Sequence, residues 1–295
     1  MNDSLERHRF AIVNGDDFGF SKGVNQAVIK AHEQGILTST SLMVTGAAFE
    51  EAIELAKAHP NLAVGLHLVL CCGSAALPST QIPHLVDATG QFPDDSVLAG
   101  LRYQFDQAAR QELFQEIRAQ LERFRQTGLP LSHVDGHLHL HMHPVVLRYL
   151  VDLADEFNIR VIRLPSEELK LALKLDRRDL FTKLIWSSVF TGLRRYGEGL
   201  LRSHHIRFPE RVYGFLQTGR MTEEYWLRLL PQIQADWVEI YSHPAIALPE
   251  EPSNGPLGLG PSELDALLSD RVRDALSKAG FQLTNYNNRQ IAPGQ

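Results

Sequence analysis

The sequence predicts an α/β protein with a mainly parallel sheet that closes into a barrel. Short β-type runs alternate with longer segments of 3.6-residue periodicity along the whole chain, which is typical of consecutive βα units. Residues with reactive side chains lie toward the ends of several different predicted strands. A barrel collects functional groups from many strand ends around one mouth, whereas a doubly wound sheet concentrates them at one switch point. The distribution of reactive residues over several strand ends therefore favours the barrel.

Composition limits the class of protein. The chain has 295 residues, of which 44% are hydrophobic and 22% charged, and its formal net charge is -6. These values are typical of one globular domain, 1–295, without a bilayer-spanning run or a general nucleic-acid-binding surface. The N-terminal residues lack the apolar core of a secretory signal, and the adjacent Cys71 and Cys72 cannot form a disulfide framework. We therefore expect a cytoplasmic, reduced location.

The elements follow from periodicity and from glycines near the helix ends, at Gly35, Gly128 and Gly280. Strands are predicted near 10–13, 39–44, 62–70, 133–140, 160–164, 212–216, 237–241 and 282–286. Helices are predicted at 23–33, 47–58, 107–126, 144–157, 222–232 and 261–279.

Two adjacent carboxylates, Asp16 and Asp17, follow the first predicted strand in the motif N-G-D-D-F-G. Neighbouring side chains project in different directions, so one carboxylate can hold a metal ion while the other faces a substrate as a base. Aspartate and glycine are also common in solvated turns, so this motif alone does not decide between the two interpretations.

His67 is a lone polar ring in the apolar run A-V-G-L-H-L-V-L, which forms the third predicted strand. A lone histidine in such a run is more often a hydrogen-bonded core residue than a metal ligand. This motif is therefore also ambiguous on its own.

The strongest signal is H-V-D-G-H-L-H-L-H-M-H-P at 133–144. In an extended strand, side chains alternate between faces. For as long as the strand lasts, one face would therefore carry Asp135 and five histidines, namely His133, His137, His139, His141 and His143. Polar side chains buried on a parallel strand are costly unless they are paired or coordinated. Every second residue advances the strand by about 6.6 Å, so the histidines cannot all bind one ion. We expect one ligand from the strand end, with its neighbours beside it or touching substrate.

Three further residues are candidates by their positions. His243 follows the seventh predicted strand and precedes a proline, and together with the other motifs it is a natural proton donor. Arg163, in V-I-R-L-P, could hold the base carboxylate or bind substrate. Glu239 is the other candidate, and either Arg163 or Glu239 could equally form a structural ion pair.

Several competing signatures are absent from the sequence. It contains no Walker A, G-x-G-x-x-G, H-E-x-x-H or paired C-x-x-C motif, so nucleotide-binding and structural-zinc interpretations lose support. One aspartate with two histidines makes a workable open metal site, because three protein ligands leave positions for water and a substrate oxygen.

A helical, basic insertion is predicted at about 166–211. Ten basic and four acidic residues lie in 169–211, around the apolar stretch L-F-T-K-L-I-W-S-S-V-F. One interpretation is a helical excursion that packs on the barrel or on a second subunit of a homodimer. The other is a cap that receives a lipid tail and makes peripheral contact with the anionic inner membrane face.

These motifs, together with S-K-G-V-N-Q-A, S-T-S-L-M-V and S-H-P, resemble the YdjC-like carbohydrate deacetylases, which include the chitooligosaccharide deacetylases. The resemblance runs in order from about Phe10 to Tyr286. The stretches A-V-G-L-H-L-V-L, I-P-x-L-V-D-A-x-G-x-F and T-G-L-P-L-S-H-V-D-G-H are most similar to the branch associated with hopanoid biosynthesis.

The resemblance implies a distorted (β/α) barrel that removes an acetyl group from an N-acetylated sugar with one divalent metal ion. It implies Asp17, His67 and His137 as metal ligands, Asp16 as the general base and His243 as the general acid. The ligand set favours zinc, but magnesium or another divalent ion also fits. The hopanoid branch implies a glycolipid substrate, a lipid-linked N-acetylglucosamine.

Three alternatives remain open from the residues. The chain could deacetylate chitooligosaccharides, or hydrolyse another bond such as a phosphoester or a lactam. A non-catalytic sugar- or metal-binding protein would keep the ligands, but it would not need Asp16 and His243.

Overall fold

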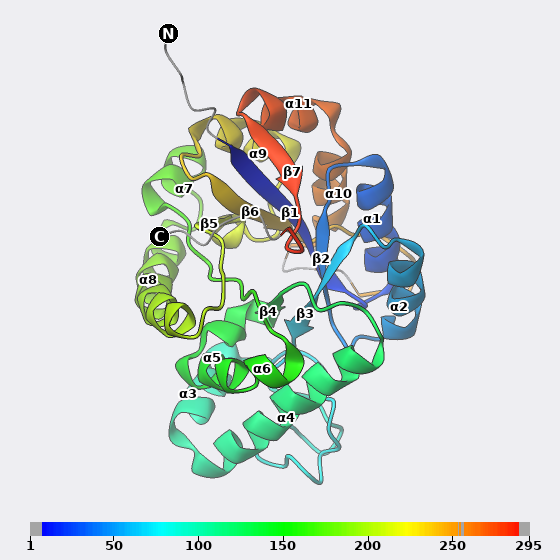
Figure 1. Cartoon of the computed structure of the whole chain (residues 1–295), viewed down its shortest axis with the longest axis vertical. Coiled ribbons are helices and arrows are strands. Elements are labelled where there is room, and N and C mark those ends of the chain that lie inside the picture. The colour runs from blue at the N-terminus through cyan, green and yellow to red at the C-terminus, as the bar shows by residue number, and fades with distance from the viewer. Residues whose placement is uncertain (1–7, 253, 255–256, 289–295) are drawn as a thin grey trace.

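Strand β1 (Arg9–Phe18) is the centre of a parallel sheet in the computed structural model, which describes residues 8–252, 254 and 257–288 (Figure 1). Within these residues seven strands form one sheet in the order β4-β3-β2-β1-β6-β5, and β7 pairs with the N-terminal half of β1. The other strands are β2 (Ser39–Leu42), β3 (Ala63–Leu68), β4 (Val134–Gly136), β5 (Arg211–Tyr213), β6 (Trp237–Ser242) and β7 (Phe281–Thr284). The first seven residues, on which the expectation about a secretory signal rests, lie outside the described ranges.

The edge strands β4 and β5 approach each other through the segment 161–166. Isolated bridges join Val134 to Ile162 and Ser166 to Val212, so the sheet curls toward closure without a complete strand at this point. The strand predicted at 160–164 is therefore wrong as a regular strand. Pro165 ends the run and has no N–H to donate to a ladder. The predicted α/β barrel is confirmed, in a distorted and half-closed form.

Helices connect the strands and surround the sheet. They are α1 (Lys22–Gln34), α2 (Phe49–Ala58), α3 (Ser96–Phe105), α4 (Gln107–Gln126), α5 (Pro144–Asp152), α6 (Ala154–Phe157), α7 (Leu169–Leu175), α8 (Leu180–Ser203), α9 (Glu223–Leu229), α10 (Gly260–Leu268) and α11 (Asp270–Lys278). Side-chain caps explain several starts: Ser21 accepts from Val24 N, and Asp106 accepts from Ala108 N and Ala109 N.

Three predicted helices are shorter than expected. The helix predicted at 144–157 is divided into α5 and α6, and the one at 222–232 ends as the 3₁₀ turn η3 (Leu230–Gln232). The helix predicted at 261–279 is divided because extended Ser269 caps α11 through a hydrogen bond from Val272 N. Periodicity continues across such a break, so it does not show the cap.

Helix α3 was not predicted from the sequence. Asp95 caps it, accepting from Val97 N and Leu98 N. Its large apolar side chains Val97, Leu98 and Phe105 are mostly exposed, so they do not form the core-facing stripe that periodicity detects.

The barrel interior is layered. At the N-terminal end of the strands, Ile12, Val161, Trp237 and Tyr286 form a small apolar cluster. Above it lies a fully buried polar layer with members from several strands, Asn14, Ser41, His133, Asp135, Arg163 and Glu239. The main apolar core lies between the sheet and the helices. The polar layer supports the side chains at the C-terminal ends of the strands.

The segment 169–203 folds as α7 and α8, and α8 packs against α5 and against the 3₁₀ helix η1 (His137–Met142) that follows β4. No helix in the described ranges is both long enough and apolar enough to cross a bilayer.

Candidate active site

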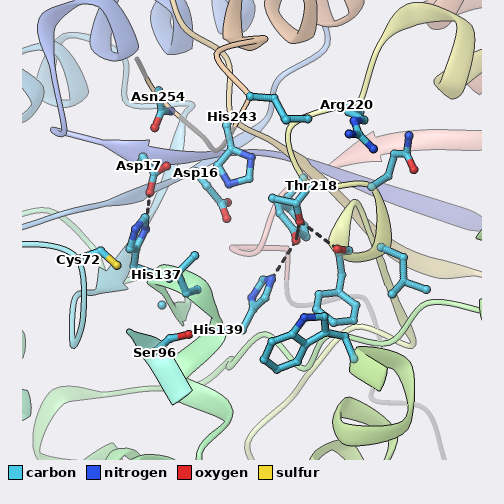
Figure 2. Close-up of a pocket in the computed structure, with 18 of the residues that line it drawn as sticks. Asp16, Asp17, Cys72, Ser96, His137, His139, Thr218, Arg220, His243 and Asn254 are labelled. Carbon is cyan, nitrogen blue, oxygen red and sulfur yellow. Dashed lines mark hydrogen bonds and ion pairs between the residues drawn. The ribbon is translucent and has the colours of Figure 1, made fainter. Parts of the chain in front are cut away.

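A cavity of about 610 Å³ opens where the C-terminal ends of the strands meet. Asp16 and Asp17 of β1, His67 of β3, His137 after β4 and His243 after β6 all line it. Figure 2 shows Asp16, Asp17, His137 and His243 around this opening. The structure thus brings together the five residues predicted as ligands, base and acid.

A bulge in β1 lets two adjacent aspartates reach the same cavity. The pairing of β1 with β2 shifts register between Gly15 and Phe18, and Asp17 has a φ of 67°. Bulges re-aim side chains and are common next to active sites, and the left-handed conformation is less costly for aspartate than for most residues. Both carboxylates are buried, at about 1% exposure.

Asp17, His67 and His137 form a compact three-residue cluster. Asp17 Oδ1 lies 3.2 Å from His67 Nε2 and 3.2 Å from His137 Nδ1. One potential ligand atom from each of the three residues lies within 4.8 Å of the others. Burial raises the pKa of Asp17, but attraction to His137 and hydrogen bonds from both rings outweigh it and hold the pKa well below its usual range. One carboxylate and two imidazoles facing one point are a donor set that fits a divalent ion.

Asp135 orients the His67 ring. Its Oδ1 lies 2.9 Å from His67 Nδ1, which leaves Nε2 directed to Asp17. A carboxylate on the far nitrogen is the usual partner of a metal-binding histidine, because it fixes the tautomer. Burial lowers the pKa of His67, but Asp135 and Asp17 outweigh burial and raise it to about 10. The cluster therefore favours a positive charge at this position, either a proton or a metal ion.

A second group, Asp16, His67 and Asp135, has comparable spacing but fits an ion less well. Both oxygens of Asp16 accept from Arg163, at 2.7 Å each. Asp135 Oδ2 accepts from Ser41 Oγ at 2.7 Å and lies 2.8 Å from Arg163 Nη1. Because these oxygens already have partners, the group with Asp17 and His137 is the better candidate.

Arg163 is fully buried among three carboxylates, those of Asp16, Asp135 and Glu239. Burial lowers its pKa, but the three negative charges outweigh burial and raise it well above its usual range. Glu239 accepts from Arg163 through Oε1 and from the Tyr286 hydroxyl through Oε2. Burial raises the pKa of Glu239 to about 7. Neither Arg163 nor Glu239 lines the cavity, and of the roles considered from the sequence the structure shows an ion pair between the two. Arg163 binds Asp16, and Glu239 in turn binds Arg163.

The histidine ladder predicted for 133–143 does not exist, because β4 ends at Gly136. The backbone continues as η1, in which Leu138 and His139 have left-handed φ values of 47° and 58°. Among the described residues, β4 has a regular partner only in β3 and a single bridge on its other side, and none of these pairings extends beyond Gly136. The histidines consequently point in different directions.

Each histidine then has a separate environment. His139 lines the cavity and lies 2.9 Å from the Tyr241 hydroxyl, whereas His141 lies beneath it, with Nε2 2.9 Å from the Arg163 carbonyl oxygen. His133 stacks on Tyr286, and His143 accepts from Val145 N at the start of α5.

His243 lies in the loop after β6. Its backbone N–H donates to Glu263 Oε2 at 2.5 Å, and its Nδ1 is 3.9 Å from the same oxygen. The ring packs edge-on against Tyr241, with 5.7 Å between centroids. Glu263 is fully buried on α10 and thereby fixes the loop that presents His243.

The cavity extends along α8, where its wall is aromatic. Trp186, Phe190 and Phe215 line it, and the Phe190 and Phe215 rings lie 4.4 Å apart between centroids. His139 contacts both phenylalanines. One end of the cavity is therefore polar and the other is apolar.

Sequence reasoning did not single out Tyr241, Glu263 or Ser41 as parts of the site. It placed Asp135 on the same face as the predicted ligand His137 but gave it no role. Glu263 had no signal, since a glutamate in an amphipathic helix usually faces solvent.

Comparison with known proteins places the chain in a family. Residues 10–278 match the family model described as YdjC-like protein. A carbohydrate deacetylase of Brevibacillus brevis is 45% identical over 222 residues, which are 73% of this chain and 81% of the relative. One from Vibrio cholerae is 30% identical over 285 residues, 96% of this chain and 97% of the relative.

A solved structure has a similar fold. It is a protein from Enterococcus faecalis V583, named for a suspected role in cellobiose-phosphate cleavage, with a TM-score of 0.75 and 26% identity over 95% of this chain and 98% of that one. The chain belongs to the YdjC-like protein family.

Proposed function

We propose that this protein is a metal-dependent carbohydrate deacetylase that hydrolyses the acetamide of an N-acetylated sugar to a free amine and acetate. The observation that carries the proposal is the cluster of Asp17, His67 and His137 in one cavity with Asp16 and His243. The relatives from Brevibacillus and Vibrio, which are named carbohydrate deacetylases, support the same chemistry.

Asp17, His67 and His137 would hold the metal ion. Bound there, the ion supplies Lewis-acid polarisation of the acetyl carbonyl and lowers the pKa of water toward neutrality. Two imidazoles and one carboxylate favour zinc over magnesium, which prefers oxygen ligands.

Asp16 is the proposed general base. Arg163 holds both its oxygens and Asn14 donates to Oδ1 at 2.7 Å, so the carboxylate cannot rotate. Each carboxylate oxygen has two lone pairs. Oδ2 has Arg163 as its single partner in the described part of the chain, so it can still accept a proton from a water molecule in the cavity.

His243 is the proposed general acid. Its ring lines the cavity, and Glu263 and Tyr241 hold the loop and the ring in place. An amide nitrogen does not leave as an anion, so the sugar amine needs a proton as the C–N bond breaks. A histidine on the cavity wall can deliver it.

For the substrate we favour a lipid-linked N-acetylglucosamine, as in the hopanoid branch, over a free chitooligosaccharide. The aromatic wall of Trp186, Phe190 and Phe215 supports this choice, because it offers an apolar surface beside the polar site. Phosphoester hydrolysis is disfavoured. Among the described residues of the cavity, Lys183 bonds to Gln217 and Arg220 pairs with Asp179, so both cations are occupied.

The roles of the two aspartates can be separated by experiment. Asp17→Ala should lose bound metal and acetate release together. Asp16→Asn should keep its metal and lose roughly 100-fold or more of turnover, the usual scale for a general base. Both variants are purified and analysed for metal, and acetate release is followed on chitooligosaccharides and on an N-acetylglucosaminyl lipid. A metal-free Asp16→Asn would contradict the assignment of base and ligand.

A further inference from the structure

Exposed apolar side chains form a rim on three elements that are separate in sequence. Helices α3 and α8 both pack against η1, and Figure 1 shows them on the same side of the molecule with α5 between them. We call this surface the apolar rim. Its members are Val97, Leu98, Leu101 and Phe105 of α3, Leu138 of η1, and Phe181, Leu184, Ile185 and Val189 of α8.

The outer face of α8 has the pattern of a helix that packs against something. Phe181, Ile185 and Val189 follow one another at four-residue spacing and are 80%, 63% and 44% exposed. The opposite face of this half packs against the protein, because Phe190 is buried and Trp186 contacts the hydrophobic core. A surface helix normally has polar residues on its outer face. The N-terminal half of α8 is therefore apolar on two sides, and only one of them has a partner within the described residues.

The apolar rim borders the mouth of the active-site cavity. Ser96 at the start of α3, Leu138 of η1 and Trp186 of α8 line that cavity. A second copy or another protein seated on the rim would cover the mouth. A lipid bilayer would instead bring membrane-anchored substrate to it, which makes the bilayer the better occupant.

Within helices α3 and α8 themselves the charges agree with an anionic surface, and the exposed carboxylates Asp95 and Asp179 lie at their N-caps. Neither α3 nor the first eighteen residues of α8 contains a carboxylate, while Arg102 of α3 and Arg195 of α8 are exposed. Arg194 does not contribute, because it is buried and bonds to the carbonyl oxygens of Leu164 and Glu210. Apolar insertion would supply most of the binding, with a smaller contribution from basic side chains.

We propose that the apolar rim rests on the surface of a lipid bilayer that contains anionic lipids, with the cavity mouth facing the headgroups. The choice of a bilayer rests on the proposed function, because a lipid-linked sugar is presented at that surface. The binding itself is a separate property and can be measured without catalysis.

The test is co-sedimentation of the metal-loaded protein with vesicles of phosphatidylcholine and phosphatidylglycerol. The variant Phe181→Ser/Ile185→Ser should lower the partition coefficient by about tenfold or more, because it removes two inserted side chains. Leu101→Ser/Phe105→Ser should act in the same direction from α3. The control is Leu283→Ser, which replaces an apolar side chain of 40% exposure on β7. It should bind like wild type.

Charge and catalysis give independent readouts. Arg195→Gln should weaken binding by about fivefold on anionic vesicles and little on pure phosphatidylcholine. Acetate release from a soluble acetamido sugar should stay within about twofold in all these surface variants.

Failure of the membrane proposal can be distinguished from failure of the proposed function. Wild-type protein that releases acetate but does not bind vesicles overturns the membrane proposal alone. So does light scattering that shows a wild-type dimer which Phe181→Ser/Ile185→Ser converts to a monomer. Vesicle binding without acetate release overturns the proposed function and leaves the rim as a membrane surface.

Discussion

Replacing Asp135 by asparagine tests whether the polar layer controls metal binding. Asp135 is fully buried, and among the described residues its carboxylate has three partners within 3 Å, at 2.9 Å from His67 Nδ1, 2.7 Å from Ser41 Oγ and 2.8 Å from Arg163 Nη1. All three can donate, and an asparagine offers one acceptor oxygen and one donor group.

Either orientation of the asparagine disturbs the site. With its oxygen toward His67, its amide hydrogens face Arg163 and Ser41, which costs about 1–3 kcal/mol for the unpaired donors. With its amide toward His67, the proton of the imidazole is displaced to Nε2, the atom that faces Asp17. We therefore expect Asp135→Asn to lower metal affinity by about 10- to 100-fold, or about 1.4–2.7 kcal/mol.

The assay is competition for zinc against a chromophoric chelator, combined with thermal unfolding to show that the variant is folded. Ser41→Ala is the matched control, since it removes a neutral partner of the same carboxylate and leaves its contact with His67 intact. We expect its metal affinity to stay within about threefold of wild type. A folded Asp135→Asn variant with wild-type affinity would refute the argument that Asp135 orients His67.

Three further predictions concern catalysis, pH and packing. His243→Ala should slow hydrolysis of an acetamide far more than that of an ester analogue, because an alkoxide leaves with less protonation than an amine; equal losses in the two kcat values would point to orientation instead of proton donation. Burial raises the pKa of Glu167 to about 7, above its unfolded value, so its contribution to the free energy of unfolding falls as pH rises from about 4.5 to 7. Glu167→Gln cannot ionise and keeps an acceptor for Leu216 N. Its free energy of unfolding in urea should therefore rise by about 2 kcal/mol relative to wild type between pH 4.5 and 8, a value discounted for partial exposure; a difference that does not change with pH would exclude this ionisation. A Cβ on Gly65 would lie 2.3 Å from the His133 ring, so Gly65→Ala should lower the free energy of unfolding by about 1–3 kcal/mol, whereas a wild-type Tm would mean that His133 can move away from Tyr286.

The strands and most helices were predictable because their signals are local. Helix α4 has its predicted bounds, since Asp106 caps it and its apolar residues repeat at helical spacing. The interruption at Ser269 is a local capping hydrogen bond, and the incomplete strand near Pro165 depends on tertiary pairing; periodicity reports neither. Helix α3 was not predicted because its large apolar residues are exposed and do not form a core-facing stripe.

The candidate site was predictable to the extent that it depends on strand ends. Asp16, Asp17, His67 and His243 follow or end strands of one parallel sheet, so their convergence follows from topology. The turn after Gly136 did not follow, because the conformation of η1 depends on where β4 loses its neighbours. The predicted alternation along 133–143 therefore failed for His139, His141 and His143, although His137 still reaches Asp17.

The central claim is that one metal ion in the Asp17, His67 and His137 cluster makes this chain a deacetylase. The most direct test strips the wild-type protein with a chelator, returns zinc in known amounts, and measures acetate released from an N-acetylated sugar. We expect no acetate from the stripped protein and a rate that rises with added zinc and levels off at one ion per chain. Full acetate release from metal-free protein, or a requirement for two ions per chain, would contradict the claim.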